Sequence, residues 1–317
     1  MPVPAVDDLI EAARRGDRGA LARLLSIVER GGETAREVGR SVHGLGDGAY
    51  TVGITGAPGS GKSTLTSALI DLLRRRGERV AVLAIDPSSP FSGGAILGDR
   101  VRMGDHALDE GVFIRSMATR GHLGGLAVAA PEAVRVLTAA GYPWVMLETV
   151  GVGQVEVDVV GQADTTVVIV NPGWGDAVQA NKAGLMEIAD VFVVNKADRP
   201  GADATARDLR RMLDMAQPQG WRPPVVCTTA TSGAGVDDLW QAVADHRAHL
   251  ASSGGLDERR RRRAAEEVSR LVAARLLERA RAAMAGARAT ELAEAVAAGE
   301  LDPWSAADSV LADEPPG

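Results

Sequence analysis

The chain has 317 residues, 45% of them apolar, which is enough for one large α/β domain with flanking helices or for two modest domains. Its formal net charge of -7 argues against partners such as nucleic acid or anionic membranes, because binding to either relies on positive potential. With one cysteine, no signal-peptide-like start and no apolar run near the roughly 20 residues of a membrane span, the chain is expected in the cytoplasm.

The first elements expected along the chain are two short amphipathic helices within residues 6–30. Apolar residues recur there at helical spacing, and Gly16 interrupts the pattern. From Tyr50 the pattern changes to short β-branched runs that alternate with helical stretches. Such alternation predicts an α/β fold in which a mainly parallel sheet is covered by helices on both faces. The expected strands are 50–55, 80–85, 112–116, 144–149, 165–170, 191–195 and 224–229.

The C-terminal part of the chain is expected to be a helical arm. After about residue 250 the strand patterns stop, and residues 252–255 (Ser-Ser-Gly-Gly) are expected to link to helices that reach residue 312. Apolar residues at helical spacing between 268 and 277 need burial against a partner surface, so we expect this arm to form a homodimer. The five arginines at 259–263 are interpreted as a solvated helix face, with a binding patch as the alternative. The expected division is a helical extension over 1–48, an α/β domain over 49–250 and the arm over 251–317.

A glycine-rich segment follows the first expected strand and opens a helix, which are the pattern and the context of a phosphate-binding loop, or P-loop. Glycines let backbone N–H groups converge on phosphate oxygens, and the helix N-terminus favours anions. Lys62 can reach the β- and γ-phosphates, and Ser63 can offer its hydroxyl to Mg²⁺. The segment consists of Gly56, Ala57, Pro58, Gly59, Ser60, Gly61, Lys62, Ser63 and Thr64.

The sequence Asn195-Lys196-Ala197-Asp198 ends a later apolar strand, where a ligand-binding loop belongs in an open α/β sheet. A carboxylate at Asp198 can accept hydrogen bonds from N1 and N2 of guanine, which adenine cannot supply, so the site is expected to bind GTP and GDP. The alternative is that Asp198 is a helix cap before Pro200. Thr229 and Ala230, after the last strand, are expected to present backbone groups to the guanine edge.

Three carboxylates lie at strand ends, or in the loops beside them, on the same edge as the P-loop: Asp86, Asp99 and Glu148. Mg²⁺ prefers hard oxygen ligands, so these acids and Ser63 are candidate ligands. With Lys62 on the phosphates, Asp86 or Asp99 could also orient the attacking water. Asp86 could instead form a turn ahead of Pro87, and Asp99 could be a helix cap.

Three longer runs, at residues 86–103, 113–125 and 148–154, resemble the MeaB/ArgK family of P-loop GTPases, and the resemblance spans about residues 50–250. It implies a homodimeric G-protein chaperone for an adenosylcobalamin-dependent acyl-CoA mutase, typically methylmalonyl-CoA mutase. In that role the protein gates cofactor loading and protects the mutase. Residues 49–250 would then be the GTPase domain, covering the expected nucleotide motifs.

The resemblance also assigns roles to particular residues. Asp86 and Asp99 match acids of the first switch, and Glu148 matches an acid linked to magnesium. Gly151, Gly153 and Gln154 fall in the second switch, and Gln179 and Lys182 fall in the third.

Composition adds weight to Lys182. Only three of the 35 basic residues are lysines, and the other two, Lys62 and Lys196, belong to nucleotide motifs. A solvated helix charge, which is the alternative for Lys182, would more readily have become arginine in this chain.

Other function classes stay open at this stage. A nickel-insertion GTPase would need soft ligands such as paired Cys or Cys/His clusters, and the chain has one cysteine, Cys227, and five scattered histidines. A P-loop kinase would have less use for the guanine-selecting Asp198. An interaction module with an inactive nucleotide site would have less reason to keep Lys62, Ser63 and Glu148.

Overall fold

A computed structural model of the chain describes residues 5–46, 48–86, 106, 108–118, 125–149, 162–173, 187–216 and 220–312. The chain divides into two compact units, Met1–Arg260 and Arg261–Gly317. Within the described ranges, no helix combines the length and the apolar character that crossing a bilayer requires.

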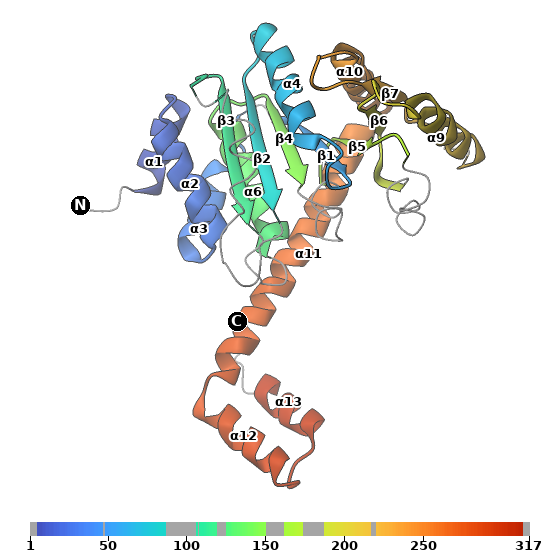
Figure 1. Cartoon of the computed structure of the whole chain (residues 1–317). Coiled ribbons are helices and arrows are strands. Elements are labelled where there is room, and N and C mark those ends of the chain that lie inside the picture. Colours follow the sequence, from blue (N-terminus) through green and yellow to red (C-terminus); the bar gives the residue numbers. More distant parts are fainter. Residues whose placement is uncertain are drawn as a thin grey trace. The chain divides into compact units, whose positions relative to one another are not determined.

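The first unit is built on a seven-stranded sheet with the order β3-β2-β4-β1-β5-β6-β7 (Figure 1). All pairs are parallel, which confirms the expected α/β fold. The chain order reverses around β1, which lies between β4 and β5, and ligands bind at such switch points. The strands are β1 (Tyr50–Gly56), β2 (Val80–Asp86), β3 (Val112–Ala118), β4 (Trp144–Thr149), β5 (Thr165–Val170), β6 (Val191–Asn195) and β7 (Val225–Thr228).

Both faces of the sheet are buried, because alternate residues of each strand enter different cores. In β4, Val145 and Leu147 pack with α6 (Gly125–Ala139), whereas Met146 packs on the opposite face. That opposite face is covered by α4 (Lys62–Arg75) and α10 (Val236–Ser253), and α9 (Ala202–Ala216) covers β5 and β6 on the α6 side. Figure 1 shows α4 in front of the sheet and α6 behind it. Helix layers on both faces explain why the strands are nearly continuous apolar runs.

Three N-terminal helices extend the core beside β3: α1 (Val6–Arg14), α2 (Arg18–Arg30) and α3 (Glu33–Val42). The sequence predicted the first two but not α3. Gly31 and Gly32 have positive φ angles of 72° and 84°, so the chain leaves α2 and starts α3 within two residues. Arg115 of β3 donates to Glu29 of α2 over 2.8 Å, so an ion pair with little exposure joins α2 to the edge of the sheet.

Two expectations about the start of the C-terminal helices are wrong. Residues 252–255 are not a linker, because α10 runs to Ser253 and α11 (Gly255–Met284) begins two residues later. Gly254 has a φ of 70°, a left-handed conformation that turns the chain between two helices within one residue. The run at 259–263 is not uniformly solvated, since Arg259 and Arg260 are half-buried and form ion pairs with Asp190 and Asp164.

The second unit comprises the rest of α11 with α12 (Ala287–Ala297) and α13 (Pro303–Ala312), and α12 packs on α13. Asp302 caps α13 by accepting from the backbone N–H groups of Trp304 and Ser305 at 3.0 and 3.1 Å. Hydrogen bonding from Ser305 lowers the pKa of Asp302. Beyond residue 261, the large apolar side chains of α11 are exposed by 39–61% within this single chain: Val268, Leu271, Val272, Leu276, Leu277 and Met284.

A buried polar network lies where β1, β5 and β6 begin. His246 of α10 is fully buried, and its Nδ1 lies 2.8 Å from Thr165 Oγ1, which in turn lies 2.7 Å from the Tyr50 hydroxyl. Burial lowers the pKa of His246 to about 4. Asp190, whose Oδ1 lies 3.3 Å from Nε2, works against this shift, whereas Arg259 and His249 add to it. His246 is therefore neutral near pH 7, and its contact with Asp190 is not an ion pair there.

His246 is expected to make stability depend on acid. An unfolded histidine binds a proton near pH 6.5, whereas native His246 does so near pH 4, so the unfolded state holds more protons between these values. The free energy of unfolding should fall as the pH is lowered through this window, by at most about 1.4 kcal/mol per pH unit from this residue. Urea denaturation between pH 4 and 7 measures the slope, which His246→Gln should reduce. The same substitution at the exposed His43 is the control, and equal slopes for both variants and wild type would contradict the assignment.

Candidate functional site

The P-loop connects β1 to α4 and passes close to two neighbouring strands. Gly56 has a φ of 149°, and a Cβ there would lie 2.2 Å from the carbonyl oxygen of Ile169 in β5. Gly61 has a φ of 90°, and a Cβ there would lie 2.4 Å from the side-chain nitrogen of Asn195. Only glycine fits at either position without displacing the neighbour. Because the P-loop packs this closely against β5 and β6, these two strands constrain its path.

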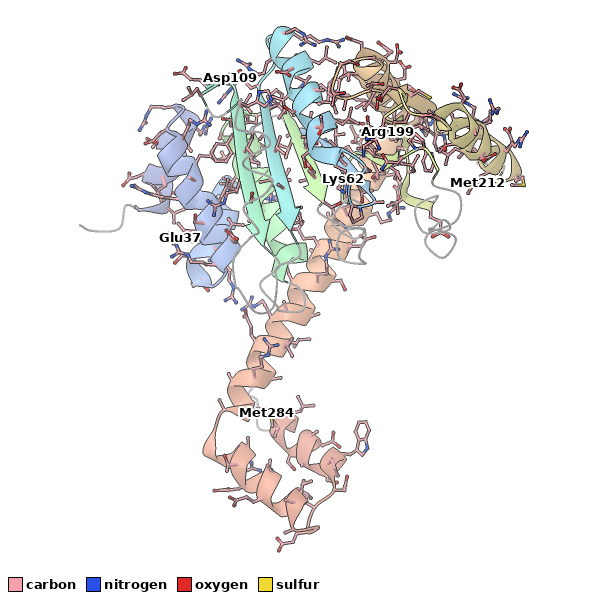
Figure 2. The ribbon with its side chains drawn as sticks, viewed as in Figure 1. Glu37, Lys62, Asp109, Arg199, Met212 and Met284 are labelled. Carbon is pink, nitrogen blue, oxygen red and sulfur yellow. The ribbon has the colours of Figure 1, made fainter. Side chains whose placement is uncertain are left out.

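Two lysines from different parts of the sequence bind the same loop. Lys62, labelled at the start of α4 in Figure 2, donates from Nζ to the carbonyl oxygens of Gly56 and Ala57 at 2.8 and 3.2 Å. Lys196 Nζ donates to the carbonyl oxygen of Gly59 over 2.6 Å. A compact ammonium has three donors and can face a concave loop from within, which suits phosphate binding at this position.

Ser63 and Glu148 meet beneath the P-loop. The hydroxyl of Ser63 donates to Glu148 Oε1 over 2.6 Å, and both residues are buried. Glu148 is the penultimate residue of β4, and Asp86 ends the adjacent strand β2. A hydroxyl and a carboxylate are hard oxygen ligands of the kind that Mg²⁺ prefers, so this pair fits a magnesium ion beside bound phosphates.

Asn195 joins the P-loop to the segment after β7. Its side-chain amide donates to the carbonyl oxygen of Ser60 over 2.8 Å. Its Oδ1 accepts from Thr228 Oγ1 at 3.1 Å and from the backbone N–H of Ala230 at 3.2 Å. With 2% exposure, Asn195 is a buried connection between the P-loop and the segment that is predicted to bind the base. Sequence reasoning missed Thr228, although a threonine ending the strand beside Asn195 was the available signal.

The backbone after β6 turns sharply before Asp198. Lys196 has a φ of 58°, the only positive value at a non-glycine residue in the described part of the chain. The Ala197 N–H donates to the carbonyl oxygen of Thr228 over 3.0 Å, and Asp198 follows in an exposed turn. The left-handed conformation is unfavourable for lysine and is held by the surrounding hydrogen bonds. In the loop after β7, the backbone N–H of Thr229 donates to the carbonyl oxygen of Ala234 over 2.9 Å. This bond closes the loop that lies beside Ala197.

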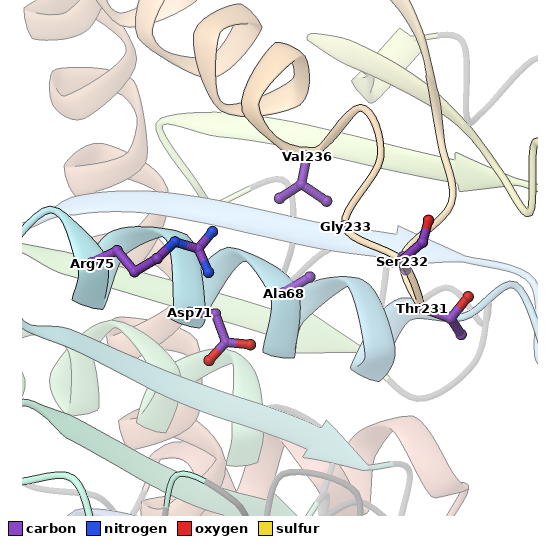
Figure 3. A pocket seen from close by; sticks show the side chains of 8 residues that line it. Ala68, Asp71, Arg75, Thr231, Ser232, Gly233 and Val236 are labelled. Carbon is purple, nitrogen blue, oxygen red and sulfur yellow. The ribbon is translucent and has the colours of Figure 1, made fainter.

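A pocket lies between α4 and the loop that follows Ala230 (Figure 3). Asp71 and Arg75 of α4 line it together with Thr231 and Ser232. Ala230 belongs to the segment that is predicted to bind the base, and it also lines this pocket. The α4 residues of the pocket lie in later turns of the helix, whereas Lys62 is its first residue. It is therefore an adjoining feature and not the phosphate site.

The described structure brings most of the predicted nucleotide residues to one edge of the sheet. The P-loop, Glu148, Asn195 and Ala230 come from four separate strands or their following loops, and all lie at carboxyl ends. The predictions for Asp99, Gly151, Gly153, Gln154, Gln179 and Lys182 lie outside the described residues.

Soft metal ligands do not gather in the part of the chain that the structure describes. There, no group of three or more histidines, cysteines or acids lies close enough to hold a metal ion. Cys227 is half-buried on the edge strand β7.

Comparisons with known proteins agree with this geometry. A family model described as "Methylmalonyl Co-A mutase-associated GTPase MeaB" matches residues 21–285. GTPase ArgK of Escherichia coli is 38% identical, with 81% of this chain and 80% of that protein covered. The mouse protein named methylmalonic aciduria type A homolog, mitochondrial, is 32% identical, with 96% of this chain and 79% of that protein covered.

A solved structure extends the likeness over nearly the whole fold. The crystal structure described as a LAO/AO transport system kinase is 26% identical to this chain, with a TM-score of 0.72. The match covers 98% of this chain and 99% of that one. The family match and these identities confirm the resemblance expected from the sequence. The chain belongs to the MeaB family of GTPases.

Proposed function

We propose that this GTPase binds GTP at the P-loop, selects guanine with Asp198, and reports its nucleotide state to an adenosylcobalamin-dependent acyl-CoA mutase. The observation that carries the nucleotide part is Asn195, whose side chain fixes the P-loop to the base-binding segment through Ser60 and Ala230. The family match to mutase-associated GTPases supports the partner. Methylmalonyl-CoA mutase is the proposed mutase, and gating of cofactor loading with protection of the enzyme is the proposed role.

The catalytic arrangement needs little covalent chemistry from the chain. Lys62 would neutralise β- and γ-phosphate charge from within the loop. Ser63 and Glu148 would hold Mg²⁺, with Asp86 or Asp99 as a further ligand or as the group that orients water. When bound, the ion supplies charge stabilisation to the transferring phosphate. We further propose that the protein acts in the cytoplasm and that its partner accelerates hydrolysis.

Guanine selection is expected to depend on the carboxylate of Asp198. Asp198→Asn replaces an acceptor by a donor that opposes guanine N1 and N2, so affinity for GTP should fall by more than about tenfold. Relative affinity for xanthosine nucleotides, which carry an oxygen at C2, should improve. Titration with both nucleotides measures the change. Asp208→Asn, at an exposed position on α9, is the control; unchanged GTP affinity in the Asp198 variant would remove the assignment.

Coupling to the mutase is expected to depend on Lys182. Lys182→Ala should keep GTP affinity near that of wild type while reducing mutase-stimulated hydrolysis, because the guanine and phosphate contacts come from other residues. Lys182→Arg keeps the charge but changes a compact ammonium into a planar fork, so stimulation should still be impaired. Single-turnover hydrolysis with and without methylmalonyl-CoA mutase measures both effects. Equal stimulation of all three proteins would show Lys182 to be a surface charge, and no stimulation of wild type would reject that partner.

The exposed apolar side chains of α11 support a proposed homodimer. Leu271 and Val272 are exposed by 39% and 53% in the single chain, and α11 buries none of its residues. Exposed apolar residues at helical spacing on one helix are typical of an interface.

Placing charge in this surface should separate the subunits. Leu271→Glu with Val272→Glu would bury two carboxylates on association, so light scattering of the full chain should report a monomer. The control variant, Glu266→Lys with Glu267→Lys, changes the charge of the same helix but replaces none of its apolar residues. This variant should remain a dimer. A dimer that persists in the first variant contradicts the proposed interface.

A further inference from the structure

The first two residues of the arginine run, Arg259 and Arg260, bind specific acceptors on the sheet unit. Arg259 faces Asp190, the residue before β6, with Nη1 2.9 Å from Oδ2 and Nη2 2.7 Å from Oδ1. Two parallel N–H donors on one carboxylate make the pair bidentate. Asp190 Oδ2 also accepts from the backbone N–H of Thr166 over 2.9 Å, so the carboxylate is attached to β5 as well. Its side chain is only 8% exposed, and a charge buried to this degree requires a partner.

Arg260 makes the corresponding contact one strand further along. Its Nη2 lies 3.1 Å from Asp164 Oδ2, and the Asp164 side chain, just before β5, is 2% exposed. Asp164 accepts from the backbone N–H of Thr51 in β1 over 3.0 Å. Arg260 also donates to the carbonyl oxygen of Ala49 over 3.2 Å. The two arginines therefore bind the amino ends of β1, β5 and β6, opposite the edge that holds the P-loop.

Apolar packing contributes little at the same place. In the first turns of α11, Leu256 is the one apolar residue packed on the sheet unit, and it is only partly buried. Leu256, Arg259 and Arg260 have the spacing i, i+3 and i+4, so they share one face of the helix. The compact sheet unit ends at Arg260, directly after these contacts. The attachment of these turns is therefore mainly ionic.

We propose that Arg259 and Arg260, with Asp190 and Asp164, form a buried ionic clasp that holds the root of α11 on the sheet unit and that can open without unfolding the sheet. The physical basis is that the carboxylates on the sheet and the arginines on the helix differ in the contacts that remain after they separate. The carboxylates keep backbone partners in β1 and β5 when the arginines leave. On the helix side, the described contact that would remain is the packing of Leu256. The clasp makes residues 255–260 a detachable strap, independent of whichever partner the exposed part of α11 binds.

Arg259→Lys in the full chain is the test, because it keeps a positive charge beside Asp190 and so avoids an uncompensated buried carboxylate. A lysine ammonium cannot reproduce the bidentate contact. Backbone amide hydrogen exchange of residues 258–262 should accelerate by about tenfold, while amides in β5 and β6 keep their wild-type rates. Arg262→Lys is the matched control from the same run, since Arg262 is 69% exposed and its nearest acid, Glu266, is 3.9 Å away.

Two results would overturn the proposal. Equal exchange at residues 258–262 in the Arg259→Lys and Arg262→Lys proteins would show that the clasp does not hold the helix. Equal acceleration in β5, β6 and the helix root would show that the root does not open separately from the sheet. The double variant Asp190→Asn with Arg259→Ala removes both charges and should keep the strands protected while residues 258–262 exchange faster. Loss of strand protection in that variant would equally reject a separable clasp.

Discussion

The nucleotide edge of this protein depends on the side chain of Asn195. One amide connects Ser60 in the P-loop with Thr228 at the end of β7 and with Ala230 in the loop that follows, over distances of 2.8 to 3.2 Å. These segments lie 135 and 35 positions from Asn195 in the sequence, so no local preference brings them together. The parallel sheet does so, because carboxyl ends of parallel strands converge at one edge. Loss of this contact would remove a buried connection between the P-loop and the loop that follows β7.

Lysine and arginine perform different tasks at the two ends of the same strands. At the carboxyl ends, Lys62 and Lys196 direct single ammonium groups toward carbonyl oxygens of the P-loop. At the amino ends, Arg259 and Arg260 direct planar guanidinium groups toward buried carboxylates. A point charge fits inside a small loop that must also hold phosphate, whereas a fork matches the two oxygens of a carboxylate. This division accounts for lysine at positions 62 and 196 in a chain that uses arginine at most of its other basic positions.

The chain belongs to the MeaB family and shares its fold with other P-loop proteins. Two local features complete its nucleotide edge. The pairing of Ser63 with Glu148 connects β4 to the P-loop, next to the end of β2. The left-handed backbone at Lys196 is unfavourable for a non-glycine residue, and the surrounding hydrogen bonds hold it in place. Neither feature follows from the fold alone, since many P-loop proteins share the fold and perform other reactions.

The sequence alone determined the seven strands, the parallel sheet and the P-loop, because apolar runs and glycine spacing express backbone requirements that are local. It also determined the family, through long runs whose order is carried by the chain itself. Only the tertiary structure decided that Asn195 connects three segments, that Gly254 replaces a linker, and that two of five arginines are ion-paired with buried acids. The Asn195 contacts and the two ion pairs depend on partners far away in sequence, and Arg259 and Arg262 differ only in what the fold places beside them.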